Sequence, residues 1–265
     1  MKNLLLSAVL VSLPLLLGGC GKSEFEELTE LAEQGDADAQ SKLGWAYAHG
    51  KGVAEDDAEA AKWFRKAADQ GYAQAQTNLG VMYAEGDGVA KDRAEAIKWW
   101  RKAAEQGDAL AQFYLGVMYD NGKGVAKDRA EAAKWFRKAA DQGYAQAQTN
   151  LGVMYAEGDG VAEDDVEAIK WYRKAAEQGD ARAQFSLGVM YAEGDGVAKD
   201  LEEAIKWWRK AADQGDANAQ FNLGWAYSNG EGVAKDSEEA AEWFRKAAEQ
   251  GHAGAQRALK KLESE

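Results

Sequence analysis

The sequence repeats itself with a period of 36 residues, and this period constrains the possible folds more than any other feature of the chain. Each copy opens with the tetrad Ala-x-Ala-Gln, which begins at seven evenly spaced alanines: Ala37, Ala73, Ala109, Ala145, Ala181, Ala217 and Ala253. Six complete units fill residues 37–252 without an insertion, residues 24–36 match the second half of a unit, and residues 253–265 match the first half. Residues 58–90 are identical to residues 130–162, which indicates that two units were copied together.

Each unit predicts two helices joined by a glycine-rich loop. In the second unit, small and apolar residues at helical spacing predict a first helix from about Ala73 to Glu85, and two glycines in residues 86–89 allow the chain to reverse. A second helix is predicted to begin after Asp92 and to stop at Gly107. A capping pair of aspartate and glutamate, three residues apart, recurs in all six units: Asp56/Glu59, Asp92/Glu95, Asp128/Glu131, Asp164/Glu167, Asp200/Glu203 and Asp236/Glu239.

A helix pair of this size cannot fold alone, because backbone entropy of roughly 1–2 kcal/mol per ordered residue exceeds what one small hairpin recovers by burial. In the first unit, the second helix carries Ala60 and Trp63 on one side and Phe64 on another, so it needs two neighbours. Stacked copies supply both neighbours. The sequence therefore predicts an all-α fold, an α/α superhelical solenoid of antiparallel helix pairs, with a half-repeat helix in residues 24–36 and a capping helix in residues 253–265.

The first twenty residues are predicted to have a separate role. Lys2 gives a positive start, and residues 4–17 form an apolar run that is too short for a membrane span of about 20 residues. Residues 1–19 are therefore predicted to be a signal peptide. The run ends in Leu17-Gly18-Gly19-Cys20, which resembles a bacterial lipobox.

The lipobox resemblance implies that the sulfur of Cys20 is acylated before cleavage, so that residues 20–23 form a lipidated, short tether to a membrane. Gly21 directly after the cysteine favours, by the same resemblance, the outer membrane. The expected location is thus the bacterial cell envelope, as an outer-membrane lipoprotein that faces the periplasm. The alternative is an ordinary cleavage after Gly19 that leaves a free thiol.

Charge and residue usage exclude several classes of partner. The chain carries 32 Lys+Arg against 45 Asp+Glu, a formal net charge of -13, which argues against nucleic acid. Cys20 is the only cysteine, so the repeats can hold no cysteine-ligated metal. The segment from Asp120 to Glu131 is only faintly like a calcium loop, because Gly122 and Gly124 stand where ligands are required. We expect neither a metal nor a cofactor.

The sequence offers little for catalysis. No serine stands in a Gly-x-Ser-x-Gly or Ser-x-x-Lys setting, and the absence of the second motif speaks against a serine β-lactamase of the usual kind. His49 and His252 are six repeats apart and are expected to be surface or capping residues. Tryptophan recurs once per unit at one fixed place, as a packing residue does. We therefore predict that the chain is not an enzyme.

The complete unit resembles the Sel-one-like repeat, a variant of the tetratricopeptide repeat. The shared pattern is Ala-x-Ala-Gln-x-x-Leu-Gly-x-x-Tyr-x-x-Gly-x-Gly-Val, followed by Asp-x-x-x-Ala-x-x-Trp-aromatic-x-Lys-Ala-Ala, and it covers residues 24–265. The resemblance implies a right-handed superhelix whose concave face is lined by the first helix of each unit. It also implies an adaptor that binds a protein or peptide partner in the envelope.

Two other functions stay open at this point. A cysteine-rich branch of the same family has been linked with penicillin binding and weak β-lactamase activity, so an envelope hydrolase acting on a β-lactam or a cell-wall fragment is one alternative. That branch carries a disulfide in each repeat, and this sequence has no such cysteines. The other alternative is a surface-exposed array that binds a host protein.

Candidate partner-binding residues lie on the first helix of each unit, where side chains vary while the repeat pattern stays constant. In tetratricopeptide arrays the second, fifth, sixth and ninth positions of that helix tend to face the groove. The resemblance thus points to these groove residues: Asn78, Leu110, Phe113, Tyr114, Asn150, Arg182, Phe185, Phe221 and Asn222. Asparagine can bind a peptide backbone as donor and acceptor, and the aromatic rings offer apolar anchors. Alternatively, the fifth-position aromatics pack between adjacent first helices.

Overall fold

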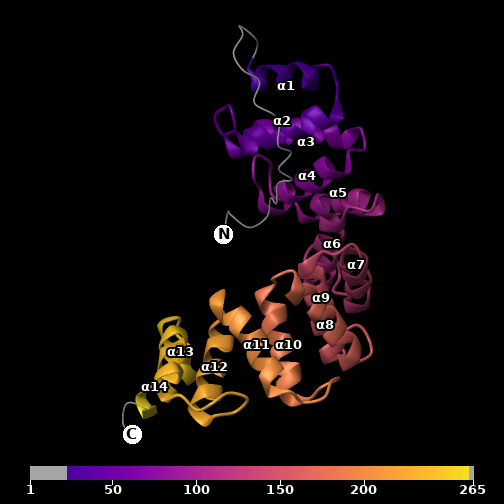
Figure 1. Cartoon of the computed structure of the whole chain (residues 1–265). Coiled ribbons are helices and arrows are strands. Elements are labelled where there is room, and N and C mark those ends of the chain that lie inside the picture. Colours follow the sequence, from indigo (N-terminus) through magenta and orange to yellow (C-terminus); the bar gives the residue numbers. More distant parts are fainter. Residues whose placement is uncertain (1–22, 263–265) are drawn as a thin grey trace.

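The computed structural model describes residues 23–262, which form fourteen α-helices and no strand (Figure 1). The predicted signal peptide and the lipidation site at Cys20 lie outside the described residues. Among the helices of residues 23–262, none combines the length and the apolar character needed to cross a membrane.

The helices alternate between two kinds, as the repeat predicts. Seven begin at the first alanine of the tetrad and are called A helices: α2 (Ala37–His49), α4 (Ala73–Glu85), α6 (Ala109–Asn121), α8 (Ala145–Glu157), α10 (Ala181–Glu193), α12 (Ala217–Asn229) and α14 (Ala253–Leu262). The other seven are called B helices: α1 (Glu24–Glu33), α3 (Asp57–Asp69), α5 (Arg93–Glu105), α7 (Arg129–Asp141), α9 (Asp165–Glu177), α11 (Leu201–Asp213) and α13 (Ser237–Glu249).

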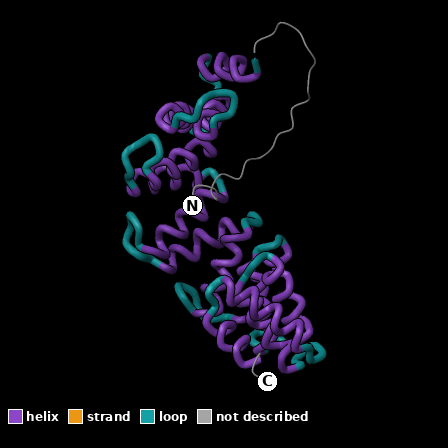
Figure 2. The backbone as a smooth tube through the Cα atoms, turned by 90° about the vertical axis from the view of Figure 1, so that its left-hand side faces the viewer, coloured by secondary structure: helices purple, strands orange, loops and turns teal. Residues whose placement is uncertain are grey.

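Each helix packs mainly against the helices before and after it in the chain. Figure 1 shows the pairs following one another in sequence order, and Figure 2 shows the same elongated, curved body from the side. One core cluster after another is built in the same way: in the first of them, Phe64 of α3 and Leu79 of α4 are buried together with Trp99 of α5. The predicted solenoid of helix pairs is therefore confirmed, and its stability rests on interfaces between nearest neighbours.

The B helices from α3 to α13 begin after the predicted aspartates, but in them the capping box is only half formed. The Asp56 carboxylate accepts a hydrogen bond from the Glu59 backbone N–H at 2.9 Å, as a helix cap requires. The N–H of Asp56 donates to the carbonyl of Tyr47 in α2 at 3.0 Å. It therefore does not donate to the Glu59 carboxylate, which a complete capping box would require. That carboxylate accepts a bond from Lys62 at 2.7 Å. The loop is thus tied to the preceding A helix, a contact that local sequence reasoning did not include.

Each A helix approaches its own B helix so closely that one position must be glycine. A Cβ atom added at Gly80 of α4 would lie 2.4 Å from Nε1 of Trp100 in α5. The equivalent glycines meet an aromatic ring in the same way: Gly44, Gly116, Gly152, Gly188 and Gly224. The small residue at this place thus lets the two helices of a pair approach closely.

A ladder of glutamine side chains, in which the tetrad glutamines are buried, connects successive units. Gln112, in the tetrad of α6, donates from Nε2 to the carbonyl of Ala104 near the end of α5 at 3.1 Å. Its Oε1 accepts a bond from Nε2 of Gln142, the residue after α7, at 2.8 Å. One amide therefore satisfies a carbonyl at the end of one B helix and anchors the end of the next, which explains why the tetrad ends in glutamine.

We expect Gln112→Leu to lower the free energy of unfolding by about 1–2 kcal/mol, because the Ala104 carbonyl then keeps only its bond from the Gly107 N–H and Nε2 of Gln142 loses its acceptor. The matched control is Gln74→Leu, since Gln74 is an exposed glutamine in the next A helix toward the N-terminus and should change stability by less than about 0.5 kcal/mol. Urea unfolding followed by circular dichroism measures both. Equal effects of the two variants would contradict a structural role for the ladder.

Candidate functional site

Four positions of each A helix form a stripe along the helix. Counting the first alanine of the tetrad as position 1, they are positions 2, 6, 9 and 13, which have the helical spacing of one face. Positions 3, 4, 7 and 8 are buried in every A helix from α2 to α12 and pack in the core. We call the stripe, taken over α2 to α12, the A-helix face; in α10 it consists of Arg182, Ser186, Val189 and Glu193.

Two of the predicted groove residues come together across neighbouring units on this face. Nη1 of Arg182, at position 2 of α10, donates to Oδ1 of Asn150, at position 6 of α8, over 3.2 Å. Arg182 is exposed and Asn150 is half-buried, so both have polar atoms near the surface. The A-helix face is therefore continuous from one unit to the next at this point.

The fifth-position aromatics lie beside the A-helix face and pack against rings of their own unit, on its B helix and at the residue that precedes the next A helix. The Phe113 ring lies 5.0 Å from the Tyr144 ring and 5.9 Å from that of Phe136. Phe221 stacks on His252 with ring centroids 4.6 Å apart. The rings therefore pack, as in the alternative role, but their partners are a B helix and the residue before the next A helix, and both phenylalanines are only half-buried.

Burial separates the remaining predicted residues. Asn78 and Tyr114, both at position 6, are each 7% exposed and present little to a partner. The Tyr114 ring stacks on Trp100 of α5 with centroids 4.7 Å apart. Leu110 is half-buried and packs near Tyr114 in the same cluster, and Asn222 is half-buried in α12.

Both histidines have structural roles. Nδ1 of His252 accepts a hydrogen bond from the backbone N–H of Ala255 at 3.1 Å, which is the capping role expected for the start of α14. The ring of His49 stacks on that of Trp45 at the end of α2, with centroids 4.4 Å apart, and its Nδ1 lies 2.9 Å from the carbonyl oxygen of the same residue.

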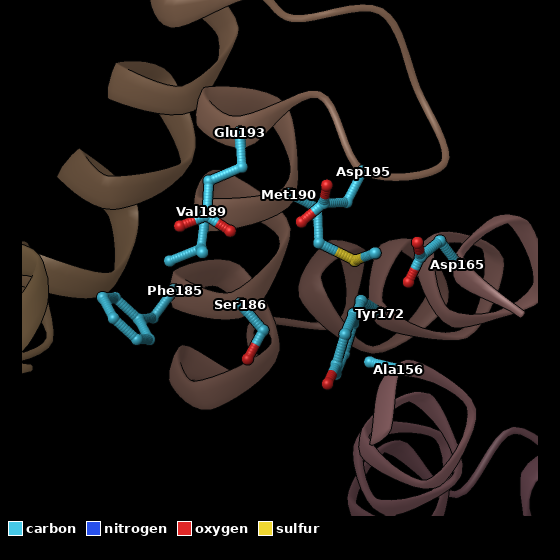
Figure 3. Close-up of a pocket in the computed structure, with 9 residues that line it drawn as sticks. All are labelled: Ala156, Asp165, Tyr172, Phe185, Ser186, Val189, Met190, Glu193 and Asp195. Carbon is cyan, nitrogen blue, oxygen red and sulfur yellow. The ribbon is translucent and has the colours of Figure 1, made fainter. Parts of the chain in front are cut away.

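A cavity of about 230 Å³ opens on the A-helix face at α10 (Figure 3). Its lining residues come from α8, α9, α10 and the loop after α10: Ala156, Asp165, Tyr172, Phe185, Ser186, Val189, Met190, Glu193 and Asp195. The cavity is thus lined by apolar side chains, by three carboxylates and by the hydroxyl groups of Tyr172 and Ser186. Of the residues predicted from sequence, only Phe185 lines it.

Electrostatics around the cavity follow from burial and from like charges. Burial, together with a hydrogen bond and repulsion from Asp195, raises the pKa of Glu193, while the positive charge of Lys199 opposes this shift. Burial raises the pKa of Tyr172 to about 12, against a smaller opposing effect of its hydrogen bond with Ser186. The Tyr172 hydroxyl therefore stays protonated at neutral pH. Such a cavity can bind a group by hydrogen bonds, apolar contact and negative charge.

Sequence reasoning missed most of this cavity, because its residues are dispersed over two units and a loop. Asp165 and Asp195 look like ordinary helix-start and turn residues when taken singly. One signal was present in the aligned units: Ser186 is the smallest side chain at position 6, where the other units from α2 to α12 carry lysine, asparagine or tyrosine.

Comparison with known proteins agrees with this geometry. The Sel1 repeat family model matches six consecutive segments: residues 37–72, 73–108, 109–144, 145–180, 181–216 and 217–252. No curated protein matches the chain. Among solved structures, the Sel1 repeat protein from Oxalobacter formigenes is 39% identical with a TM-score of 0.74, over 86% of this chain and 100% of that one.

A second solved structure is c5321, a protective antigen present in uropathogenic Escherichia coli strains that displays an SLR fold. It is 44% identical to this chain with a TM-score of 0.87, over 91% of this chain and 52% of that one. The chain thus spans about half the length of that antigen. Six matched repeats in one solenoid show that this chain belongs to the Sel1 repeat family, whose members are typically protein-interaction scaffolds and generally not enzymes.

Proposed function

We propose that this chain is an adaptor of the bacterial envelope that binds a segment of a partner protein along the A-helix face. The proposal rests on a difference between positions of the A helices from α2 to α12. Positions 3, 4, 7 and 8 are buried and carry the same residue in every unit, while positions 2 and 6 vary. A surface whose side chains vary on a constant framework is suited to the recognition of one particular partner.

Binding on this face would use shape and hydrogen-bond complementarity without a covalent step or a cofactor. Arg182 and Asn150 offer donors and an acceptor to a peptide backbone, and they already lie within hydrogen-bond distance of each other. Trp225, at position 9 of α12, is 45% exposed and offers an apolar contact. Because the solenoid holds these groups in place before binding, less conformational entropy is lost on association.

The experiment that tests the binding face is crosslinking in living cells. A photo-activatable amino acid in place of Arg182 or Trp225 is expected to capture a defined protein, whereas the same residue at Lys134 is not. Lys134 is exposed on the B helix α7 and serves as the matched position. Capture from Lys134 with none from the A-helix face would place the binding surface on the B helices and contradict the proposal.

The proposal includes a lipid anchor at Cys20, supported by its lipobox-like sequence and by the few residues that separate it from α1. We expect Cys20→Ser to move the protein from the membrane fraction to the soluble fraction and to abolish incorporation of labelled palmitate. Membrane association that is unchanged in the variant would contradict the anchor. Protease treatment of intact cells then distinguishes a periplasm-facing adaptor, which is protected, from a surface-exposed array, the alternative that the antigen relative favours.

A further inference from the structure

We propose that the cavity at α10 is a binding pocket for one arginine side chain of the partner. This inference rests on the proposed function, because it names the chemistry of the group that the A-helix face recognises. The pocket lies on that face, since Ser186, Val189 and Glu193 of its lining are positions 6, 9 and 13 of α10. Its shape and its charge each follow from one position at which the units differ.

The shape of the pocket follows from serine at position 186. In α6 the equivalent residue is Tyr114, whose ring stacks on the aromatic side chain of the preceding B helix, Trp100, at 4.7 Å. In α10 the equivalent aromatic is Tyr172, and the small Ser186 leaves the space above it unfilled. The cavity is thus the volume that a larger side chain occupies in another unit of the same chain.

The charge of the pocket follows from aspartate at position 165. In the unit before, the equivalent residue is Arg129, whose guanidinium forms ion pairs with Asp159 and, over 3.5 Å, with Asp120. The equivalents of those two partners are Asp195 and Ala156, and both line the pocket. An arginine of the protein therefore occupies, one unit away, the place that in this unit is open and bordered by Asp165.

The ligand that fits is a guanidinium on an alkyl stem. Asp165, Glu193 and Asp195 attract a cation, and the planar, weakly hydrated guanidinium is suited to paired carboxylates. Phe185, Val189 and Met190 offer apolar contact to the stem. The volume of about 230 Å³ lies below the roughly 300–1,000 Å³ of sites for drug-sized ligands, so it suits one side chain. In residues 23–262, no three carboxylate, histidine or cysteine side chains are grouped so that they could hold a metal ion.

The test uses n-propylguanidinium as the probe, with n-propylurea as the uncharged analogue of nearly the same shape. The purified protein is labelled with ¹³C in its methionine methyl groups, and the chain has only five methionines. We expect saturable chemical-shift changes at the Met190 methyl group with an apparent Kd on the order of 1–10 mM for propylguanidinium. The affinity for propylurea should be lower by about fivefold or more. Met82, at the equivalent place in α4, should not respond.

Two variants borrow residues that the repeat already accepts elsewhere, so both are expected to fold. Asp165→Arg copies Arg129 and should abolish probe binding, because the chain then supplies its own guanidinium. Ser186→Tyr copies Tyr114 and should abolish it by filling the space. The control Asp57→Arg makes the same change of charge at the equivalent position of α3, where the neighbouring A helix carries the buried Asn78 in place of serine, and should leave binding unchanged.

Equal affinity for propylurea, unchanged binding in Asp165→Arg, or equal weakening by Asp57→Arg would each overturn the inference. The first would show an apolar site, the second a site that does not involve Asp165, and the third attraction by overall negative charge. The probe experiment is independent of any cellular partner. Crosslinking from Arg182 without guanidinium binding therefore refutes the pocket alone, and guanidinium binding without crosslinking refutes the proposed binding function alone.

Discussion

Trp100→Ala is expected to lower the free energy of unfolding by about 3–5 kcal/mol, the largest effect of any single substitution considered for this chain. Trp100 is 2% exposed, and its ring stacks on that of Tyr114 in the following A helix. Its Nε1 donates to the carbonyl of Thr77 in α4 at 3.1 Å. Alanine would leave a cavity between two units and would remove this hydrogen bond to α4, so both interfaces of α5 would weaken.

The control is Trp225→Ala, which removes the same side chain from a position that is 45% exposed and should change stability by less than about 1 kcal/mol. Urea unfolding measures both variants, and amide hydrogen exchange in α4 to α6 tests whether the loss is local, because nearest-neighbour interfaces dominate in repeat arrays. A similar loss for both tryptophans would contradict the assignment of Trp100 to the core.

Gly116→Val is expected to destabilise the chain by about 3 kcal/mol through overpacking. A Cβ at this position of α6 would lie 2.6 Å from Cδ1 of Phe136, so α6 and α7 would have to separate. Because the array is held by consecutive interfaces, such a separation should also expose the ring of Phe136. The measurement is again the urea midpoint, together with a rise in exchange rates at the contact between α6 and α7.

Ala130→Val serves as the matched control, because Ala130 is an exposed residue of α7. We expect a change of about 0.6 kcal/mol from the lower helix propensity of valine. A loss at Gly116 no greater than at Ala130 would mean that the two helices have room for a side chain, against the geometry described above.

The sequence alone was sufficient to predict most of the fold, because the interactions that form it are local or repeat exactly once per unit. The tetrad, the aspartate caps and the left-handed glycines such as Gly107, with φ of 96°, define each helix within one turn of its ends. Aromatic residues at one fixed place per unit predict a core that continues from unit to unit. A constant period leaves no choice of partner, since each helix can pack only against its chain neighbours.

Contacts between units were harder to predict. The sequence offers the Glu59 side chain as a nearby acceptor for the N–H of Asp56. In the packed helix pair this N–H donates its hydrogen bond to the carbonyl of Tyr47. Asn78 and Asn150 both stand at position 6, but the first is buried and the second only half-buried, in units whose neighbours differ in sequence. Exposure at a given position is a property of three helices together.

The sequence by itself determined the helix pairs, their order and the direction in which they stack, because helix propensity, capping and burial of a two-sided apolar helix act within one unit and its neighbour. The tertiary structure alone decided where the surface is open. The cavity at α10 exists because Ser186 fails to fill a volume bordered by Tyr172 and because Asp165 replaces a cation, and these residues meet only after three helices have packed. The volume and the charge of a pocket depend on several residues that are distant in the chain, so a local sequence pattern does not predict them.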